Sequence, residues 1–464
     1  MTGREPSPFP VRLFCYTLSM SVFQKISTAL REDQLFRRVL NSSLHLFSSN
    51  TLSVVLSFVQ GIFATRLLGP DGYGLIGIVM GYASTVNSIL SFRMSEIVVR
   101  YGGEYLEKGE KKKASALVKT AGLTEMLVSV LAFLIVALTA GWAARNFSGP
   151  PAAPWMFTVF AVGLLANFNY ETSTGILQVT NRIKLQGTIN LIQSIITTFI
   201  IVAASIWNGN LVTVLYAYLL SKTILGLGMF LVAQIQLQRV LGGGWWKEPL
   251  STLTSTRELM RFAVSSNVSA TIIKIFRESE ILWVGLFLSN EAAGYYRVAY
   301  TIVSFLHIPA DPLIAASFPE INRLAAQQAW TRLKEFLRKI TTFSFLYNLA
   351  LALGLVLLGH WVILFYSGEE YLPAYPAMMA LLVGLAFNYT LFWNRPLLLS
   401  MGLPTFPVRV TLIVGLIKIA LAFLLVPRYG IVAAGALLSF YYIASVGVMA
   451  WRGAREIHHQ EAHS

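Results

Sequence analysis

Four charged residues stand close together in an apolar stretch of this sequence: Lys274, Arg277, Glu278 and Glu280. At 100° per residue of an α-helix they cover an arc of roughly 160°, with Lys274 and Glu278 one turn apart. One face of that helix must meet water or polar partners, because ionised side chains in hydrocarbon are costly. The cluster is either a cavity wall, where Lys274 and Arg277 attract an anionic group such as a diphosphate, or a set of ion pairs within one helix.

Other ionisable residues lie inside further apolar stretches. Lys418 and Lys222 have no acidic neighbour one turn away. Lys418 is near the middle of its stretch and is a candidate for a polar cavity. Lys222 is a weaker candidate, since its side chain can instead reach the membrane surface. Two prolines flank Asp311 and free backbone carbonyls there, which suits a gating kink or a cation site, although kinks also occur without such a role. The candidates for ion coupling are Glu171, Asp311, Glu278 and Glu280.

Uncharged polar residues form two stripes at helical spacing. The first stripe consists of Gln186, Asn190, Gln193 and Thr197. It occupies one helical face and suits sugar hydroxyls. The second consists of Gly74, Gly77, Gly81, Ser84, Ser88 and Ser91, and its small residues favour close helix packing over ligand binding. The candidates for a substrate cavity are Lys274, Arg277, Lys418, Arg66, Gln186, Asn190, Gln193, Asn50 and Asn267.

Apolar helices must position these residues, because 55% of the 464 residues are hydrophobic and only 12% are charged. A helix that crosses about 30 Å of hydrocarbon needs roughly 20 apolar residues. We predict an all-α polytopic membrane protein with about twelve transmembrane helices. The spans lie near 44–66, 73–93, 118–142, 153–177, 186–207, 211–234, 262–288, 293–317, 341–365, 373–394, 406–426 and 430–451.

The net charge of +14 comes from 36 Lys and Arg against 22 Asp and Glu. If the first span runs outward, 28 of the basic residues fall in the cytoplasmic loops and ends, and 4 lie inside spans. The other four, on the outer side, are Arg66, Arg145, Arg297 and Arg428. The positive-inside rule therefore predicts that both termini are cytoplasmic. It also argues against a nucleic-acid partner, since the basic residues act as topology signals without a binding module beside them.

An internal repeat divides the chain. The strings SSN, GY, EI with a following Arg, and FNY recur in the same order at offsets of 217 to 224 residues. This order indicates two six-helix bundles, related by a pseudo-two-fold axis along the membrane normal. We expect a cytoplasmic N-terminal amphipathic segment at 1–39, bundles at 40–240 and 262–451, a cytoplasmic linker at 241–261 and a cytoplasmic tail at 452–464.

Three segments resemble signatures of a known family. They are ATRLLGPDGYGLIGIVMGYAST at 64–85, VGLFLSNEAAGYYRVAYTIVSF at 284–305 and FPEINRL at 318–324. They are similar to the polysaccharide transporter family, within the multidrug, oligosaccharidyl-lipid and polysaccharide exporter superfamily. The resemblance implies a flippase for lipid-linked oligosaccharides, such as the O-antigen flippases. One feature departs from the family: members often carry an acidic residue early in the seventh span, where this chain has the mixed cluster at 274–280.

The expected function is therefore translocation of a polyprenyl-diphosphate-linked oligosaccharide across the inner (cytoplasmic) membrane by alternating access, for cell-surface polysaccharide assembly. The partners implied are the lipid-linked oligosaccharide, membrane lipid, and a polysaccharide polymerase with its chain-length machinery. We expect neither cofactor nor metal, since one Cys and dispersed His offer no ligand set and nucleotide-binding motifs are missing. The alternatives are a cation-coupled multidrug exporter of the same fold and a membrane glycan polymerase or ligase.

Overall fold

The computed structural model describes residues 34–91, 93–148, 153–253, 271, 275–276, 279–305 and 311–463. Side chains are described for these residues except 34–51, 311–312, 315–316 and 462–463. Four of the predicted site residues, Asn267, Lys274, Arg277 and Glu278, lie outside the described residues. Asn50 and Asp311 have a described backbone only, and most of the expected amphipathic segment also lies outside. Predictions that depend on these side chains stay predictions.

The described residues form helices and turns, without any strand. The first half contains α2 (Gln34–Leu90), α3 (Met94–Ile97), η1 (Val98–Gly102), α4 (Gly103–Glu107), α5 (Lys111–Ala143), η2 (Ala144–Ser148), α6 (Pro154–Ala166), α7 (Tyr170–Val179), α8 (Ile183–Ile206), α9 (Leu211–Leu241), η3 (Trp245–Lys247) and η4 (Leu250–Thr252). The second half contains α11 (Glu280–Phe287), α12 (Asn290–Phe305), α13 (Asp311–Ala326), α14 (Trp330–Tyr366), η6 (Glu369–Tyr371), α15 (Ala374–Thr390), α16 (Asn394–Ser400) and α17 (Thr405–His463).

Seven helical stretches of the described chain are long and apolar enough to cross a membrane. Two of the helices, α2 and α17, each run through two predicted spans. A glycine with positive φ bends each of them, Gly69 (φ 63°) beside Pro70 and Gly430 (φ 66°) near Pro427. Large apolar side chains are exposed on the outside, as lipid-facing residues are, with Leu138 at 85%.

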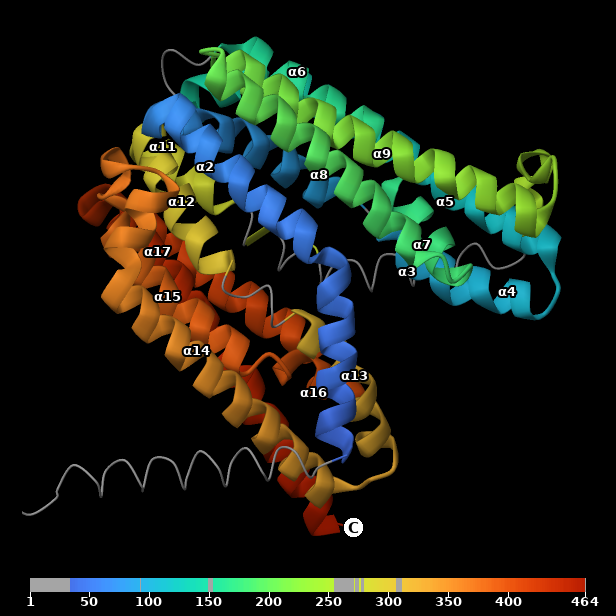
Figure 1. Ribbon diagram of the computed structural model, residues 1–464. Coiled ribbons are helices and arrows are strands. Elements are labelled where there is room, and N and C mark those ends of the chain that lie inside the picture. Colours follow the sequence, from blue (N-terminus) through green and yellow to red (C-terminus); the bar gives the residue numbers. More distant parts are fainter. Residues whose placement is uncertain are drawn as a thin grey trace, which may run out of the picture.

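The helices form two lobes that spread apart in a V (Figure 1). The N-terminal lobe contains α5 to α9 and the second half of α2, and the C-terminal lobe contains α11 to α17. The lobes meet at the end where α2 bends and α11 and α12 adjoin, which we call the closed end. They separate toward the end that holds α4, α13 and the C-terminus, which we call the open end. The predicted fold class, about twelve transmembrane helices in two six-helix bundles, is confirmed.

Glycines allow the lobes to touch at the closed end. A Cβ atom at Gly74 would clash with the Asn290 carbonyl, and a Cβ atom at Gly294 would clash with the Pro70 carbonyl. Both contacts join the second half of α2 to the first turns of α12. A side chain at either glycine would force the helices apart, so the closed end depends on small residues.

The repeated strings of the two halves lie at equivalent places in the structure. The two GY strings, at 72–73 and 294–295, begin the helices that meet at the closed end. Both FNY strings lie at breaks between helices: 168–170 spans the junction of α6 and α7, and 387–389 ends α15 shortly before α16. Equivalent positions in the two halves therefore take equivalent roles, as a pseudo-two-fold arrangement requires.

Candidate functional site

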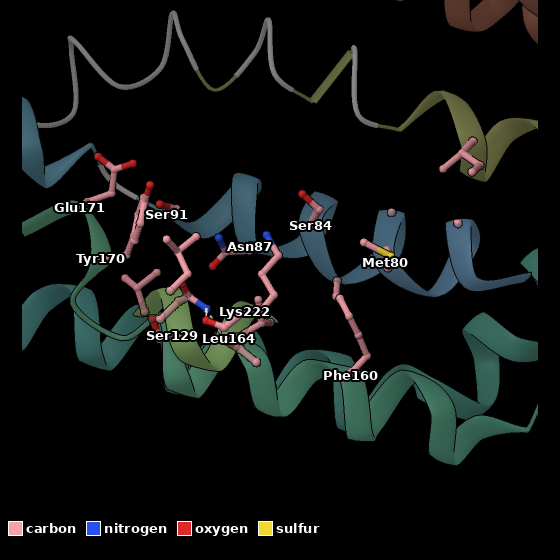
Figure 2. A pocket seen from close by; sticks show the side chains of 18 of the residues that line it. Met80, Ser84, Asn87, Ser91, Ser129, Phe160, Leu164, Tyr170, Glu171 and Lys222 are labelled. Atoms are coloured by element: carbon pink, nitrogen blue, oxygen red, sulfur yellow. Dashed lines mark hydrogen bonds between the residues drawn. The ribbon is translucent and has the colours of Figure 1, made fainter. Parts of the chain in front are cut away.

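A polar cavity of about 620 Å³ lies inside the V. It follows the second half of α2 from Gly77 to Ser91, a rise of about 21 Å at ~1.5 Å per residue. The N-terminal lobe forms most of its wall, through α2, α5, α6, α7 and α9, and α11 and α12 of the other lobe complete it (Figure 2). Its size is in the range of ligand-binding cavities, which run from about 300 to 1,000 Å³.

The stripe of small residues on α2 divides between two roles. Gly74 packs against the other lobe, as the sequence interpretation expected. Gly81, Ser84 and Ser91 line the cavity instead, with Asn87 beside them. Gly77 does both, since it lines the cavity and a Cβ atom there would clash with Ile281 and Arg297 of the other lobe. The missing or short side chains leave the space that the cavity occupies. Close packing therefore explains only part of this stripe.

Two carboxylates hold the break between α6 and α7. Both oxygens of the buried Glu125 accept backbone N–H groups from the first turn of α7, from Glu171 at 2.8 Å and Thr172 at 2.9 Å. Ser95 Oγ donates to the Glu171 carboxylate at 2.6 Å. A helix N-terminus carries partial positive charge and unpaired N–H groups, so the start of α7 stabilises the Glu125 carboxylate. Glu125 and Glu171 both line the cavity.

Lys222 of α9 also lines the cavity. Asn167, at the end of α6, fixes the backbone there by donating to the Lys222 carbonyl at 3.0 Å. In Figure 2 the Lys222 side chain extends from α9 toward α2. The sequence leaves open whether this ammonium group reaches the membrane surface or a cavity, and in the structure the residue faces the interior of the V.

Arg297 of α12 lies where the cavity meets the closed end. Its guanidinium carbon is 4.2 Å from the centre of the Tyr73 ring, and Nη1 donates to the Tyr73 carbonyl at 3.1 Å. Counting residues from the span end assigned Arg297 to the outer side, and sequence reasoning did not select it as a site residue. The available signal is its position in the family-like string GYYRVAY, where Tyr296 precedes it and Tyr300 follows one turn later.

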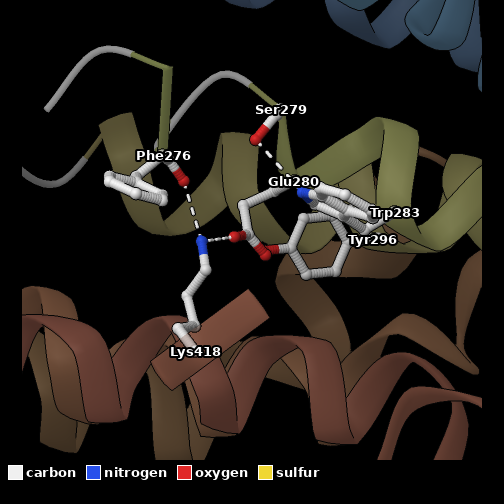
Figure 3. Close-up of polar contacts among 6 residues, drawn as sticks. All are labelled: Phe276, Ser279, Glu280, Trp283, Tyr296 and Lys418. Carbon is white, nitrogen blue, oxygen red and sulfur yellow. Dashed lines mark hydrogen bonds and ion pairs between the residues drawn. The ribbon is translucent and has the colours of Figure 1, made fainter. Parts of the chain in front are cut away.

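Lys418 is buried and is not among the residues that line the cavity. Figure 3 shows its ammonium group beside Glu280 and the Phe276 carbonyl. Its ammonium group forms an ion pair with Glu280 and donates to the Phe276 carbonyl at 2.8 Å. The Tyr441 ring lies 5.4 Å from it, and Tyr296 Oη donates weakly to Glu280 at 3.4 Å. Glu280 is thus neutralised by a residue 138 positions away. Of the charged cluster at 274–280, Glu280 is the member whose environment is described.

The remaining described candidates lie apart from this cavity. Gln193 Nε2 donates to Ser221 Oγ at 2.5 Å, so its amide joins α8 to α9. Gln186 and Asn190 are half-buried on the same helix and are not among the cavity residues. Arg66 donates to the Phe365 carbonyl at 2.7 Å, across the lobes at the closed end. A role for these residues toward a substrate stays a prediction.

The described cavity wall holds three carboxylates and two cations. Lys418 supplies the counter-charge of Glu280. The other charged groups of the wall are two carboxylates and two cations, Glu125, Glu171, Lys222 and Arg297. Among the described residues, no group of three or more His, Cys, Asp or Glu residues could hold a metal ion. The site therefore offers recognition by charge and hydrogen bonding.

Two helical lobes around a polar cavity define a polytopic membrane transporter. The model of a family described as "Polysaccharide biosynthesis protein" matches residues 39–325. The chain belongs to this family, and the resemblance found in its sequence is confirmed. The protein is a transporter and not an enzyme, which sets aside the glycan polymerase or ligase.

Individual similarities are distant but cover most of the chain. "Inner membrane protein YghQ" of Escherichia coli (strain K12) is 22% identical over 350 residues, which are 74% of this chain and 96% of that protein. A multidrug resistance MATE family transporter in an inward-facing conformation matches with a TM-score of 0.72, 13% identity and coverage of 89% and 96%. "Lipid II flippase MurJ, inward closed conformation" matches with a TM-score of 0.69, 13% identity and coverage of 88% and 87%. At this identity the two solved structures show the fold alone.

Proposed function

We propose that the protein moves a polyprenyl-diphosphate-linked oligosaccharide across the cytoplasmic membrane, for the assembly of cell-surface polysaccharide. The observation that carries this proposal is the cavity between the lobes, where Lys222 and Arg297 stand among serine, asparagine and tyrosine side chains. The cations suit a diphosphate and the hydroxyl and amide groups suit sugars. Membership of a polysaccharide biosynthesis family supports a glycan as cargo.

Alternating access is the mechanism that this shape supports. The glycan and diphosphate enter the cavity from the open end while the polyprenyl chain stays in lipid. The lobes then rock, so that the open end closes and the closed end opens. In this proposal the open end faces the cytoplasm, both termini are cytoplasmic, and the two bundles turn about the linker at 241–261.

Orientation has a direct test. In a Cys15→Ser background, single cysteines replace Lys108, beyond α4 at the open end, and Glu369, in η6 at the closed end. Both positions are exposed. A membrane-impermeant thiol reagent applied to intact cells should label the cysteine at 369 and not the one at 108. Labelling of both from one side, or the reverse pattern, contradicts the proposed orientation.

Ion coupling is assigned to Glu171 together with Glu125. Both carboxylates are in the cavity wall. Glu125 binds the backbone at the start of α7 and Glu171 stands in that first turn, so binding of a cation or proton there acts on a helix break that movement of the lobe can use. Asp311 and Glu278 keep their place as candidates from the sequence. Glu280 is less suited, because Lys418 already supplies its counter-charge.

The decisive experiment uses purified protein in lipid vesicles with an undecaprenyl-diphosphate oligosaccharide. The fraction of glycan that an external glycosidase can cleave reports translocation. We expect this fraction to change with time in vesicles that contain the protein and to stay constant in vesicles without it. Equal behaviour of the two vesicle types overturns the proposal.

A second candidate, a cation-coupled multidrug exporter of the same fold, is supported by the three carboxylates of the wall and by Tyr170, Tyr296 and Tyr300. The same vesicles, loaded with a cationic dye, test it. Movement of the dye without movement of the glycan would contradict the flippase proposal and support the exporter. Partnership with a polymerase and chain-length machinery belongs to the flippase proposal alone.

A further inference from the structure

One side chain belongs both to the cavity wall and to the closed end. Arg297 extends from α12 of the C-terminal lobe, and its contacts lie on α2 of the N-terminal lobe. They are the Tyr73 carbonyl at 3.1 Å, the Tyr73 ring at 4.2 Å and Met80 Sδ at 3.6 Å. Among the described residues, the other polar contacts between α2 and the C-terminal lobe, such as that of Arg66 with Phe365, lie outside the cavity.

The partners of this guanidinium are neutral. Among the described residues, none of its contacts is a carboxylate, whereas Lys418 has Glu280. Arginine stays charged in proteins, and a carbonyl, a ring and a sulfur compensate that charge only in part. Charge-assisted bonds to phosphate are roughly twice as strong as neutral ones and are often bidentate. An anion in the cavity therefore competes well with Tyr73 for Arg297.

We propose that Arg297 is a cross-lobe latch, which holds the closed end shut through Tyr73 and is released when a diphosphate group in the cavity binds its guanidinium. The inference rests on the proposed function, since it assigns the diphosphate of that substrate a second task. It fits the construction of the closed end, where glycine contacts allow close approach but carry no charge. A ligand shifts the equilibrium between two states only through its different affinity for them, and Arg297 supplies that difference.

The latch is tested by distance measurement rather than by transport. Spin labels replace Trp207 and Glu369, two exposed residues at the closed end of opposite lobes, in full-length Cys15→Ser protein in lipid nanodiscs. Undecaprenyl diphosphate should raise the population with the longer distance by about fivefold, the ratio for loss of one weak contact. Undecaprenol, which lacks the anion, should leave it unchanged. If inorganic pyrophosphate also raises this population, the protein recognises the diphosphate group alone. If it does not, recognition requires a diphosphate that is attached to the lipid.

Three variants separate the latch from a general structural role. Tyr73→Leu removes the ring and keeps the carbonyl, so the long-distance population should rise without any ligand. Tyr73→Phe keeps the ring over the guanidinium and loses only the hydroxyl bond to Tyr366, so the rise should be smaller. Arg297→Gln should open the closed end and abolish the response to undecaprenyl diphosphate. The matched control is Arg428→Gln, which changes an exposed arginine at the same end and should respond like the parent protein.

Two outcomes overturn the latch: a parent protein whose distances ignore undecaprenyl diphosphate, or an Arg297→Gln variant that still responds. Each variant is used only as a monodisperse protein, and Arg297→Lys, which keeps the charge without the planar fork, should respond weakly. Failure of the proposed function is a separate result. If vesicles move no glycan while undecaprenyl diphosphate still opens the closed end, the flippase proposal falls and the latch stands.

Discussion

The two lobes place buried charge in opposite ways. In the C-terminal lobe, Glu280 and Lys418 form a pair within a packed wall, surrounded by Phe276, Tyr296 and Tyr441. In the N-terminal lobe, Glu125, Glu171 and Lys222 face a cavity. A charge pair enclosed in a packed wall holds helices together, whereas a charged group at a cavity wall can be reached by a ligand. The comparison separates positions that maintain the fold from positions that we expect to carry transport.

The largest expected effect comes from removing one partner of the buried pair. Lys418→Met leaves the Glu280 carboxylate without a counter-charge in an apolar wall, which costs about 3–5 kcal/mol of unfolding free energy. Thermal unfolding of the purified protein in detergent measures it. The double variant Glu280→Gln, Lys418→Met should recover most of the loss, because no ionised group then remains. A single variant as stable as the parent would show that the pair is not structural.

Replacing a cavity cation should affect transport and spare the fold. Lys222→Gln removes one charge-assisted bond to the substrate, so glycan translocation in vesicles should fall by about 10-fold to 100-fold. Thermal stability should change less than in Lys418→Met, because glutamine keeps a polar group at the cavity wall. Lys184→Gln, on the exposed start of α8, is the matched control. Equal transport by Lys222→Gln and the parent would show that Lys222 of α9 does not bind the anionic group of the substrate.

At its glycine contacts, the closed end is sensitive to side-chain volume. Gly74→Val should overlap the Asn290 carbonyl and disfavour the described state by about 1–3 kcal/mol. A single cysteine at Asn87, in the cavity wall, should then react faster with an impermeant reagent applied from the side of the closed end. Gly354→Val is the control, since a Cβ atom there meets nothing within 4 Å. An unchanged labelling rate would contradict the glycine contact as the closure.

The smallest effect is expected at the polar stripe of α8. Gln193→Leu removes a hydrogen bond to Ser221 inside the N-terminal lobe, worth about 0.5–1.5 kcal/mol of stability. Translocation should stay near the parent level, because Gln193 is outside the cavity wall. A large loss of transport with normal stability would restore the sugar-binding interpretation of this stripe.

Much of the fold could be predicted because it follows from local sequence. Long apolar stretches require helices in a bilayer, and the bends of α2 and α17 fall at Gly69–Pro70 and near Pro427, where the backbone must deviate. The candidate site could be predicted only in part. Glu171 stands in an apolar stretch and can be selected from the sequence. Glu125 stands in the predicted span at 118–142 and meets the same criterion, but its bonds to the backbone of Glu171 and Thr172 could not be predicted, because those groups belong to another helix.

The sequence by itself determined the helical membrane class, the two-part repeat and the family, since each depends on composition, order or short strings. Only the tertiary structure decided which charges meet. Whether a charge faces lipid, a partner or a cavity depends on the rotation of each helix and on its neighbours, which lie far away along the chain. Lys418 therefore pairs with Glu280, and Arg297 crosses to Tyr73 of the other lobe.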